Sequence, residues 1–220
     1  MSSTLLFNVV LASLGETLYM VGASAALSIV IGLPLGVALV VTERNHIMAN
    51  APVNQVLSAL VNVGRSIPFV ILMVGIMPFT RLVTGTSIGT TAAIVPLTVA
   101  AVPFVARVVE TSLKEVDGGV VEAAQAMGAS PWEIIMKVLL PEAMPSLILG
   151  ATLTAINLVG YSTMAGAIGG GGLGDLAVRY GYQRFRGDVM LITVVVLVLL
   201  VQAVQMAGGA IARKVGARRG

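Results

Sequence analysis

The sequence predicts an all-α, polytopic membrane protein with five transmembrane helices in a single domain over residues 1–220. The composition is the first reason, because 57% of the residues are hydrophobic and only 10% are charged, against roughly 25% in soluble domains. The second is a mean hydropathy of +0.98, with repeated apolar runs of the length, about 20 residues, that crosses the hydrocarbon core. Third, no internal repeat, low-complexity tract or linker divides the chain.

Five apolar runs are assigned as spans, and they lie at about 17–41, 56–80, 88–109, 143–168 and 188–211. Residues 4–14, which alternate apolar and small side chains, are expected to form a short interfacial helix before the first span. Residues 2–15 carry no Lys or Arg, so a secretory signal peptide is not expected. Four prolines are expected to kink or interrupt the helices that contain them: Pro34, Pro68, Pro96 and Pro103.

The distribution of basic residues predicts the orientation of these spans. With the N-terminus outside, eight Lys and Arg residues face the cytoplasm and four face outward, while Arg65 lies within the second run. Because cytoplasmic segments carry the excess of Lys and Arg, the N-terminus is predicted outside and the C-terminus in the cytoplasm. The inner set is Arg44, Arg107, Lys114, Lys137, Arg213, Lys214, Arg218 and Arg219, and the outer set is Arg81, Arg179, Arg184 and Arg186.

Several classes of function are disfavoured by what the sequence lacks. There is no cysteine, and the one histidine, His46, lies in a short polar segment, so no metal site is expected. No GxxxxGK[ST] phosphate loop is present, and the glycine run 169–174 is interpreted as a flexible turn. No carboxylate lies in the middle of a span, which argues against catalysis and proton-driven transport. The net charge of +3 is too dispersed to indicate nucleic-acid binding.

The segment 117–141 is the one long polar, helix-like stretch between apolar runs. Asp117 is expected to cap a first helix that ends at Gly128. Ser130 and Glu133 form the pattern of a capping box for a second helix, and Pro141 is expected to end or re-aim that helix. Its run of small residues would let the backbone of a partner come close, although a plain amphipathic helix between two spans has the same composition. That run consists of Ala123, Ala124, Ala126, Gly128 and Ala129.

The spacing within this segment resembles the cytoplasmic "EAA" loop of ABC-importer permeases. The pattern is Glu-Ala-Ala, three residues, Gly, nine residues and Ile-x-Leu-Pro, and it is met here except that Val138 replaces Ile. The resemblance implies a type I ABC-importer permease fold in which 117–141 forms a cytoplasmic coupling helix that fits a groove on an ATP-hydrolysing subunit. The implied ATPase-coupling residues are Glu122, Ala123, Ala124, Gly128, Ala129, Leu140 and Pro141.

Further stretches resemble the permease subunits of methionine ABC importers, among them 65–69, 85–89, 94–98, 126–129, 159–162 and 171–174. This resemblance implies an inner-membrane subunit of a prokaryote that carries L- and D-methionine and pairs with a second copy of itself. It also implies two cytoplasmic P-loop ATPase subunits and an external methionine-binding lipoprotein. ATP would be bound by the partner, with no cofactor and no enzymatic activity in this chain. The stretch 165–170 departs from the pattern, which leaves the details of a gate open.

Four residues are candidates for the translocation path or for a contact between two copies. Arg65 either faces the path or an intersubunit contact, or it extends its charge to the cytoplasmic interface. Asn157, Tyr161 and Met164 are spaced by four and three residues and so share one helix face. That face either lines a solute path or packs against a second copy.

Two alternative functions stay open. The first is a permease for a different small solute that is delivered by another binding protein. The second is a non-transport membrane protein, either an intramembrane enzyme or a structural protein, whose cytoplasmic loop docks a partner.

Overall fold

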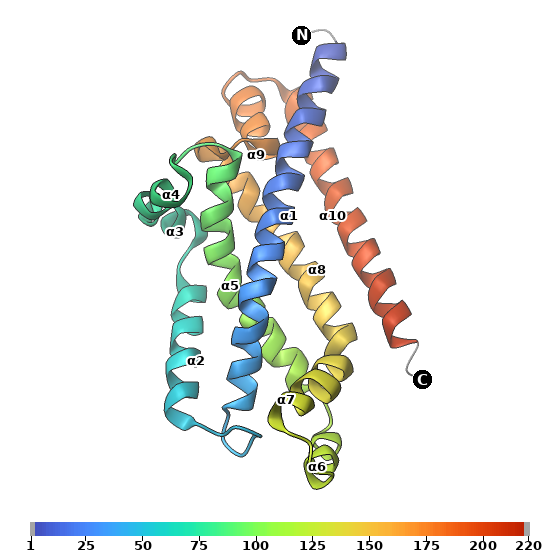
Figure 1. The fold of residues 1–220 in the computed structure, drawn as a ribbon. Helices are drawn as coiled ribbons and strands as arrows, with labels where there is room; N and C mark the ends of the chain where they lie inside the picture. Colours follow the sequence, from blue (N-terminus) through green and yellow to red (C-terminus); the bar gives the residue numbers. More distant parts are fainter. Residues whose placement is uncertain (1–2, 218–220) are drawn as a thin grey trace. The chain divides into compact units, whose positions relative to one another are not determined.

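In the computed structural model, residues 3–217 are described, with side chains from residue 6 onward, and every regular element in this range is a helix. Arg218 and Arg219, two of the expected inner charges, lie outside the described residues. The elements, shown in Figure 1, are α1 (Ser3–Val41), α2 (Ala51–Ser66), α3 (Phe69–Gly75), α4 (Met77–Thr84), α5 (Thr90–Lys114), α6 (Gly118–Ala126), α7 (Pro131–Ile134), the π-helical segment η1 (Ile135–Leu139), α8 (Leu140–Ala165), η2 (Gly166–Gly170), α9 (Gly172–Leu176), η3 (Ala177–Tyr182) and α10 (Gly187–Gly216).

The chain divides into two compact units, and each unit draws on three separate stretches of sequence. Unit 1 consists of residues 1–27, 67–101 and 154–205, and unit 2 consists of residues 28–66, 102–153 and 206–220. The long helices α1, α5, α8 and α10 each contribute one part to unit 1 and the other part to unit 2. The single domain inferred from the sequence stays a prediction.

Unit 2 is built around close packing of α1 on α5. Gly32 and Gly36 form a G-x-x-x-G pair, and a Cβ on Gly36 would lie 2.5 Å from the Cβ of Val109 and 2.6 Å from the Ala106 carbonyl oxygen. Helices in a membrane gain little from burying apolar surface, since lipid is equally apolar, so close contact between backbones is what holds them together. The core of this unit continues from Val41 through Leu113 to the loop helices α6 and α7.

Unit 1 has its own two groups of buried residues. Met20 of α1, Leu97 of α5 and Leu158 of α8 form the centre of the first group, and the ring of Phe69 stacks on that of Tyr161 at 4.8 Å. The second group joins Leu173 and Leu176 of α9 to Val189 at the start of α10, with α1 residues between Leu6 and Leu14 packed against them. The glycine-rich stretch between α8 and α9 joins Ala165 of the first group to Leu173 of the second.

The helices differ from the predicted runs in two places. Residues 4–14 do not form a separate interfacial helix, because α1 continues without a break from Ser3 to Val41. The run 56–80 contains α2, α3 and α4, and the break between α2 and α3 falls at Ile67 and Pro68. A residue before proline is pushed out of the helical region, and the proline itself lacks the N–H that would continue the ladder.

Four of the described helices are long and apolar enough to cross a membrane, and the number rises to five if the bent pair of α2 and α3 counts as one span. The four overlap the predicted runs 17–41, 88–109, 143–168 and 188–211, and the run 88–109 begins two residues before its helix. The assignment of each run as a membrane crossing stays a prediction.

Candidate functional site

The loop helix α6 is closed at both ends by local hydrogen bonds. The Asp117 carboxylate accepts a bond of 2.7 Å from the Gly119 N–H, which caps the N-terminus. At the other end the N–H of Gly128 donates to the Gln125 carbonyl at 2.9 Å, and the N–H of Ala129 donates to the Ala124 carbonyl at 3.1 Å. This pair of bonds is the Schellman motif, and it needs a left-handed residue, which Gly128 supplies with φ +81°.

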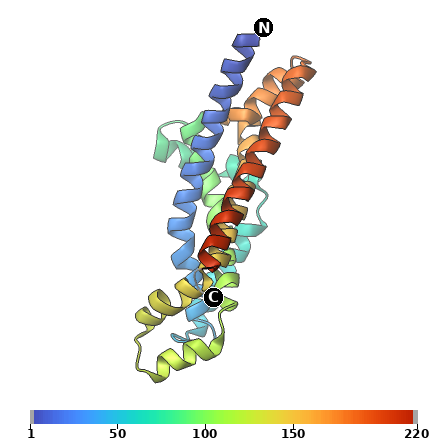
Figure 2. The same ribbon diagram turned by 90° about the vertical axis from the view of Figure 1, so that its right-hand side faces the viewer.

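The second loop helix begins at once with the predicted capping box. The N–H of Glu133 donates to the Ser130 hydroxyl at 3.4 Å, and the N–H of Ser130 donates to the Glu133 carboxylate at 3.1 Å. Lys137 then forms an ion pair of 2.9 Å with the same carboxylate. The caps at both ends of this turn are therefore made by residues close in sequence. Figure 2 shows the polar loop leaving α5 through α6 and returning through α7 toward α8.

Pro141 does not end the second helix, contrary to the expectation from the sequence. The helix passes through the π-helical segment Ile135–Leu139 and continues as α8 from Leu140. Within that segment the N–H of Leu140 bonds to the Ile135 carbonyl, five residues earlier. A π turn contains one extra residue per turn, which shifts the pattern of backbone hydrogen bonds just before Pro141. The helix can therefore continue although Pro141 has no N–H to donate.

The loop has a packed inner face and an exposed outer face. Val121, Ala124, Ile134 and Leu139 are buried in the core of unit 2. On the outer face, the side chains of Met127 and Trp132 are 82% and 68% exposed, which is unusual for large apolar groups. The predicted coupling residues divide between these environments: Glu122, Ala123 and Gly128 are exposed, Ala129, Leu140 and Pro141 are half-buried, and Ala124 is buried.

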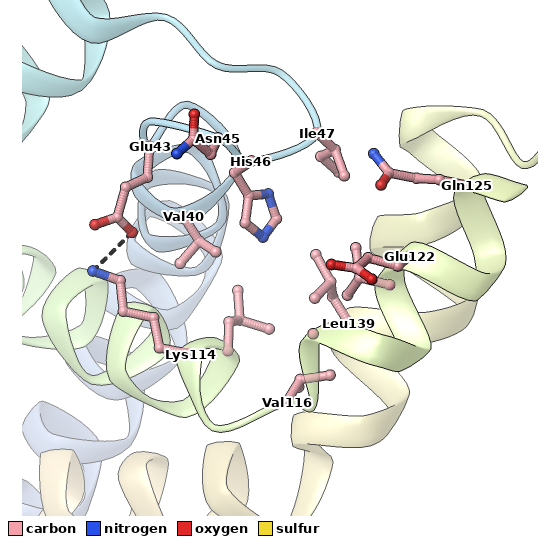
Figure 3. A pocket seen from close by; sticks show the side chains of 13 residues that line it. Val40, Glu43, Asn45, His46, Ile47, Lys114, Val116, Glu122, Gln125 and Leu139 are labelled. Carbon is pink, nitrogen blue, oxygen red and sulfur yellow. Dashed lines mark ion pairs between the residues drawn. The ribbon is translucent and has the colours of Figure 1, made fainter.

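A pocket of about 290 Å³ lies between α6, the end of α5 and the segment 42–50, all within unit 2. Figure 3 shows the His46 ring and the Glu122 carboxylate on facing walls of this pocket. The Nδ1 atom of His46 is buried and has no hydrogen-bond partner among the described residues, and burial lowers the pKa of His46 below its ordinary value. The sequence places His46 in a short polar segment and does not predict this burial.

A network of charges that sequence reasoning missed supports the wall of the pocket. The buried Glu110 carboxylate pairs with Arg107 at 2.6 Å and with Lys114 at 3.0 Å. Lys114 also pairs with Glu43 at 2.9 Å, as Figure 3 shows, and Arg107 donates a 2.6 Å hydrogen bond to the Asn62 side chain. The sequence spacings, three from Arg107 to Glu110 and four from Glu110 to Lys114, place these residues on one helix face, a signal that could have identified this cluster.

The path candidates are placed on two helices. Arg65 is exposed in the last turn of α2, in unit 2. Asn157, Tyr161 and Met164 all lie in α8 within unit 1, where Asn157 is exposed, Met164 is 46% exposed and Tyr161 stacks on Phe69. The choice between a solute path and a contact with a second copy stays open for all four residues.

The glycine run 169–174 is a packed structure in unit 1, where the sequence had indicated a flexible turn. Gly170, Gly172 and Gly174 are buried. The N–H of Gly172 donates to the Glu16 carboxylate at 2.6 Å, and the N–H of Leu173 donates to the Thr17 hydroxyl at 2.9 Å. These bonds bridge 156 residues of sequence, so no local pattern reveals them.

Among residues 3–217, no three His, Cys, Asp or Glu side chains gather as ligands for a metal ion. The groups that do converge are the charged cluster on α5 and the exposed apolar side chains of the loop 117–141. Such an arrangement suits the docking of a second protein. Long apolar helices joined by a structured polar loop define a polytopic membrane protein.

The chain belongs to the family of binding-protein-dependent transport system inner membrane components, whose model matches residues 28–216. It is 53% identical over 211 residues to the probable D-methionine transport system permease protein MetI of Vibrio cholerae, covering 96% of this chain and 94% of that protein. It is 46% identical over 213 residues to the corresponding protein of Haemophilus influenzae, covering 97% and 100%. The protein is thus an ABC-transporter permease of the inner membrane.

The comparison with solved structures confirms the predicted type I ABC-importer permease fold. A chain of the MetNI methionine ABC transporter in an inward-facing conformation matches with a TM-score of 0.95 and 51% identity, covering 98% of this chain and 99% of that one. An amino acid ABC transporter crystallised with histidines has the same fold, with a TM-score of 0.77 at 19% identity.

Proposed function

We propose that this protein is the permease subunit of an ATP-driven importer that carries methionine, as both L- and D-enantiomers, across the inner membrane. One observation carries the proposal: nearly the whole chain is 46–53% identical to D-methionine permeases over more than 200 residues. The similarity extends over both the membrane helices and the loop 117–141. It therefore concerns the whole permease chain and not only one shared motif.

The loop 117–141 serves as the docking site for a separate ATPase subunit. Met127 and Trp132 form an exposed apolar surface, and the small residues Ala123 and Ala126 beside them allow a close approach of another backbone. The inner face of the loop is packed into unit 2 through Val121 and Ile134. A push on the outer face is therefore carried directly to the helices that hold this core.

The assembly proposed for transport contains two copies of this chain, two P-loop ATPase subunits that bind ATP, and an external methionine-binding lipoprotein. The similar solved chain is part of the MetNI methionine ABC transporter, which supports an ATPase partner for this chain as well. With the N-terminus outside and the C-terminus in the cytoplasm, the loop 117–141 faces the ATPase. A ligand shifts the balance between inward-open and outward-open states only by binding them unequally, so the ATPase must contact the loop differently in the two states.

Arg65, Asn157, Tyr161 and Met164 are proposed to line the solute path or the contact between the two copies. The exposure of Asn157 and Met164 in the single chain supports this role, since a polar amide in a membrane helix needs protein or water as its neighbour.

The test is ATP-dependent uptake of labelled methionine into vesicles that contain this chain together with its neighbouring ATPase and binding protein. Unlabelled methionine of either configuration should block the uptake, while leucine and glutamine should not. ATPase activity without methionine uptake would discard the substrate and keep the importer. Failure of any P-loop ATPase to copurify with the detergent-solubilised chain would instead discard the importer.

A further inference from the structure

The short segment 180–186 concentrates aromatic and basic residues just before the last long helix. The chain has one Trp, four Tyr and five Phe, and three of these ten aromatic residues are Tyr180, Tyr182 and Phe185. Arg184 and Arg186 stand between and after them. In a chain with 5% aromatic residues, this density is a local feature that the proposed transport function does not explain.

Two of these aromatic side chains project away from the protein. Phe185 is 91% exposed and Tyr182 is 70% exposed, although both belong to residue types that are normally packed. The segment is held by its own backbone, since the N–H of Phe185 donates to the Tyr182 carbonyl at 3.2 Å and that of Arg186 donates to the Tyr180 carbonyl at 3.3 Å. The exposure is thus built into the conformation of the turn.

Phe185 also has an unfavourable backbone conformation. Its φ of +53° lies in the left-handed region, which bulky side chains rarely adopt. Glycine or asparagine would serve a simple turn at this position with less strain. A strained phenylalanine that is also exposed indicates that the side chain is required outside the protein.

The three arginines at 179, 184 and 186 differ in their ion pairs. Arg179 pairs with Asp175 at 2.9 Å, and Arg186 pairs with Asp188. Arg184 lies over the Tyr180 ring, 4.5 Å from its centroid, and makes no ion pair in the part of the chain that the structure describes. One positive charge therefore stands beside two exposed aromatic rings.

The segment is continuous with a long apolar surface that this chain leaves uncovered. It leads directly into α10, which begins at Gly187 and is a candidate membrane span. Only 11% of the most apolar stretch of α10 is buried in the protein, so its remaining side chains face lipid or another subunit. Figure 1 shows the segment 180–186 in orange, where it leads into the start of α10.

We propose that 180–186 is an interfacial anchor that inserts Phe185 and Tyr182 into the lipid headgroup region, where Arg184 meets phospholipid phosphates. Aromatic residues with a polar or charged neighbour collect at this depth because one end of the group is apolar and the other is hydrated. The anchor sets the depth at which α10 enters the membrane. The partner of the anchor is a phospholipid surface. The experiment below distinguishes it from a surface left free for the external binding protein.

The test uses tryptophan fluorescence in the full-length chain. Trp132→Phe removes the only tryptophan, and Phe185→Trp then introduces a single probe. The chain is reconstituted into vesicles of phosphatidylethanolamine and phosphatidylglycerol with bromine at shallow or deep positions on the acyl chains. Val195→Trp on the exposed face of α10 is the matched control for lipid contact, and Arg44→Trp in the exposed segment 42–50 is the control for water contact.

The proposal expects the probe at position 185 to be quenched more by shallow than by deep bromines, whereas the probe at position 195 shows the reverse order. Iodide present on both sides of the vesicle membrane should quench the probe at position 44 strongly and that at position 185 weakly. Strong iodide quenching at position 185 without quenching by bromolipids would overturn the anchor, and it is the result that a free site for a soluble binding protein would give. If the Phe185 variant fails to insert, Tyr182→Trp provides the same readout.

Discussion

Two segments of this protein are marked by glycines, and they are ordered by opposite means. In the loop 117–141 of unit 2, Gly128 ends a helix by taking a left-handed conformation, and a Cβ placed there would meet nothing within 4 Å. In the run 169–174 of unit 1, a Cβ on Gly174 would lie 2.5 Å from the Cα of Thr163. The first glycine is needed for its backbone angle and the second for the space that it leaves.

The two roles of glycine differ in how far they can be recognised from the sequence. A cap closes through bonds between residues three to five apart, so the pattern of residues is sufficient to recognise it. The run 169–174 is held by Glu16 and Thr17, which are bonded to residues 156 positions away. The folded chain must bring α1 to this run before the Gly172 and Leu173 N–H groups can form these bonds.

The largest expected effect is from Gly174→Ala. The added methyl overlaps the main chain of Thr163, which cannot rotate away, and overpacking of this kind costs about 3 kcal/mol. Thermal unfolding of the purified chain in detergent measures the loss. Gly160→Ala is the matched control, since a Cβ there meets nothing within 4 Å. Equal stability of the two variants would contradict the packing described for the run.

The second effect is from Glu16→Ala, which removes the acceptor of the 2.6 Å bond from the Gly172 N–H. A hydrogen bond to a charged group contributes about 1.5–3 kcal/mol, so the free energy of unfolding should fall by that amount. Glu16→Gln retains an acceptor oxygen and should recover part of the loss. Hydrogen exchange at the Gly172 amide should rise in the alanine variant, and unchanged exchange there would show that this bond does not hold the run.

The third effect is from Gly128→Ala, which has free space but an unfavourable backbone angle. A left-handed alanine costs about 1–2 kcal/mol, which weakens the end of α6 without disturbing the core. ATP-driven uptake should fall while membrane insertion is unchanged. Gly128→Asn should retain more uptake than Gly128→Ala, because asparagine tolerates this conformation. Full uptake by a Gly128→Val variant would end the assignment of this turn to coupling.

The smallest effect is the pH dependence of stability that comes from His46. Burial of its side chain lowers its pKa below the ordinary value of 6.5. The nearby Glu43 carboxylate acts to raise this pKa and the Lys114 ammonium to lower it. The unfolded chain therefore binds the proton on His46 more tightly than the folded chain does. The contribution of neutral, buried His46 to the free energy of unfolding is fully present above pH 6.5 and is lost as the pH falls below that value. As the one histidine of the chain, His46 can be titrated by NMR without assignment. A midpoint above that of a histidine peptide would contradict the buried placement.

Much of the architecture could be predicted from the sequence. Four of the predicted apolar runs overlap long apolar helices, and the caps at Asp117 and Ser130 form as their residue types indicate. Pro141 was the exception within the loop, because the π turn before it depends on how the helix packs into the core of unit 2.

The sequence by itself determined the all-α membrane class, the polar loop and its caps, because hydropathy and capping depend on residues that are near one another in the chain. Only the tertiary structure decided that Lys114 also pairs with Glu43, that Glu16 holds the glycine run, and that Phe185 points outward. Those contacts depend on which helices lie side by side and on how closely their backbones approach. That information is not contained in any local pattern of residues.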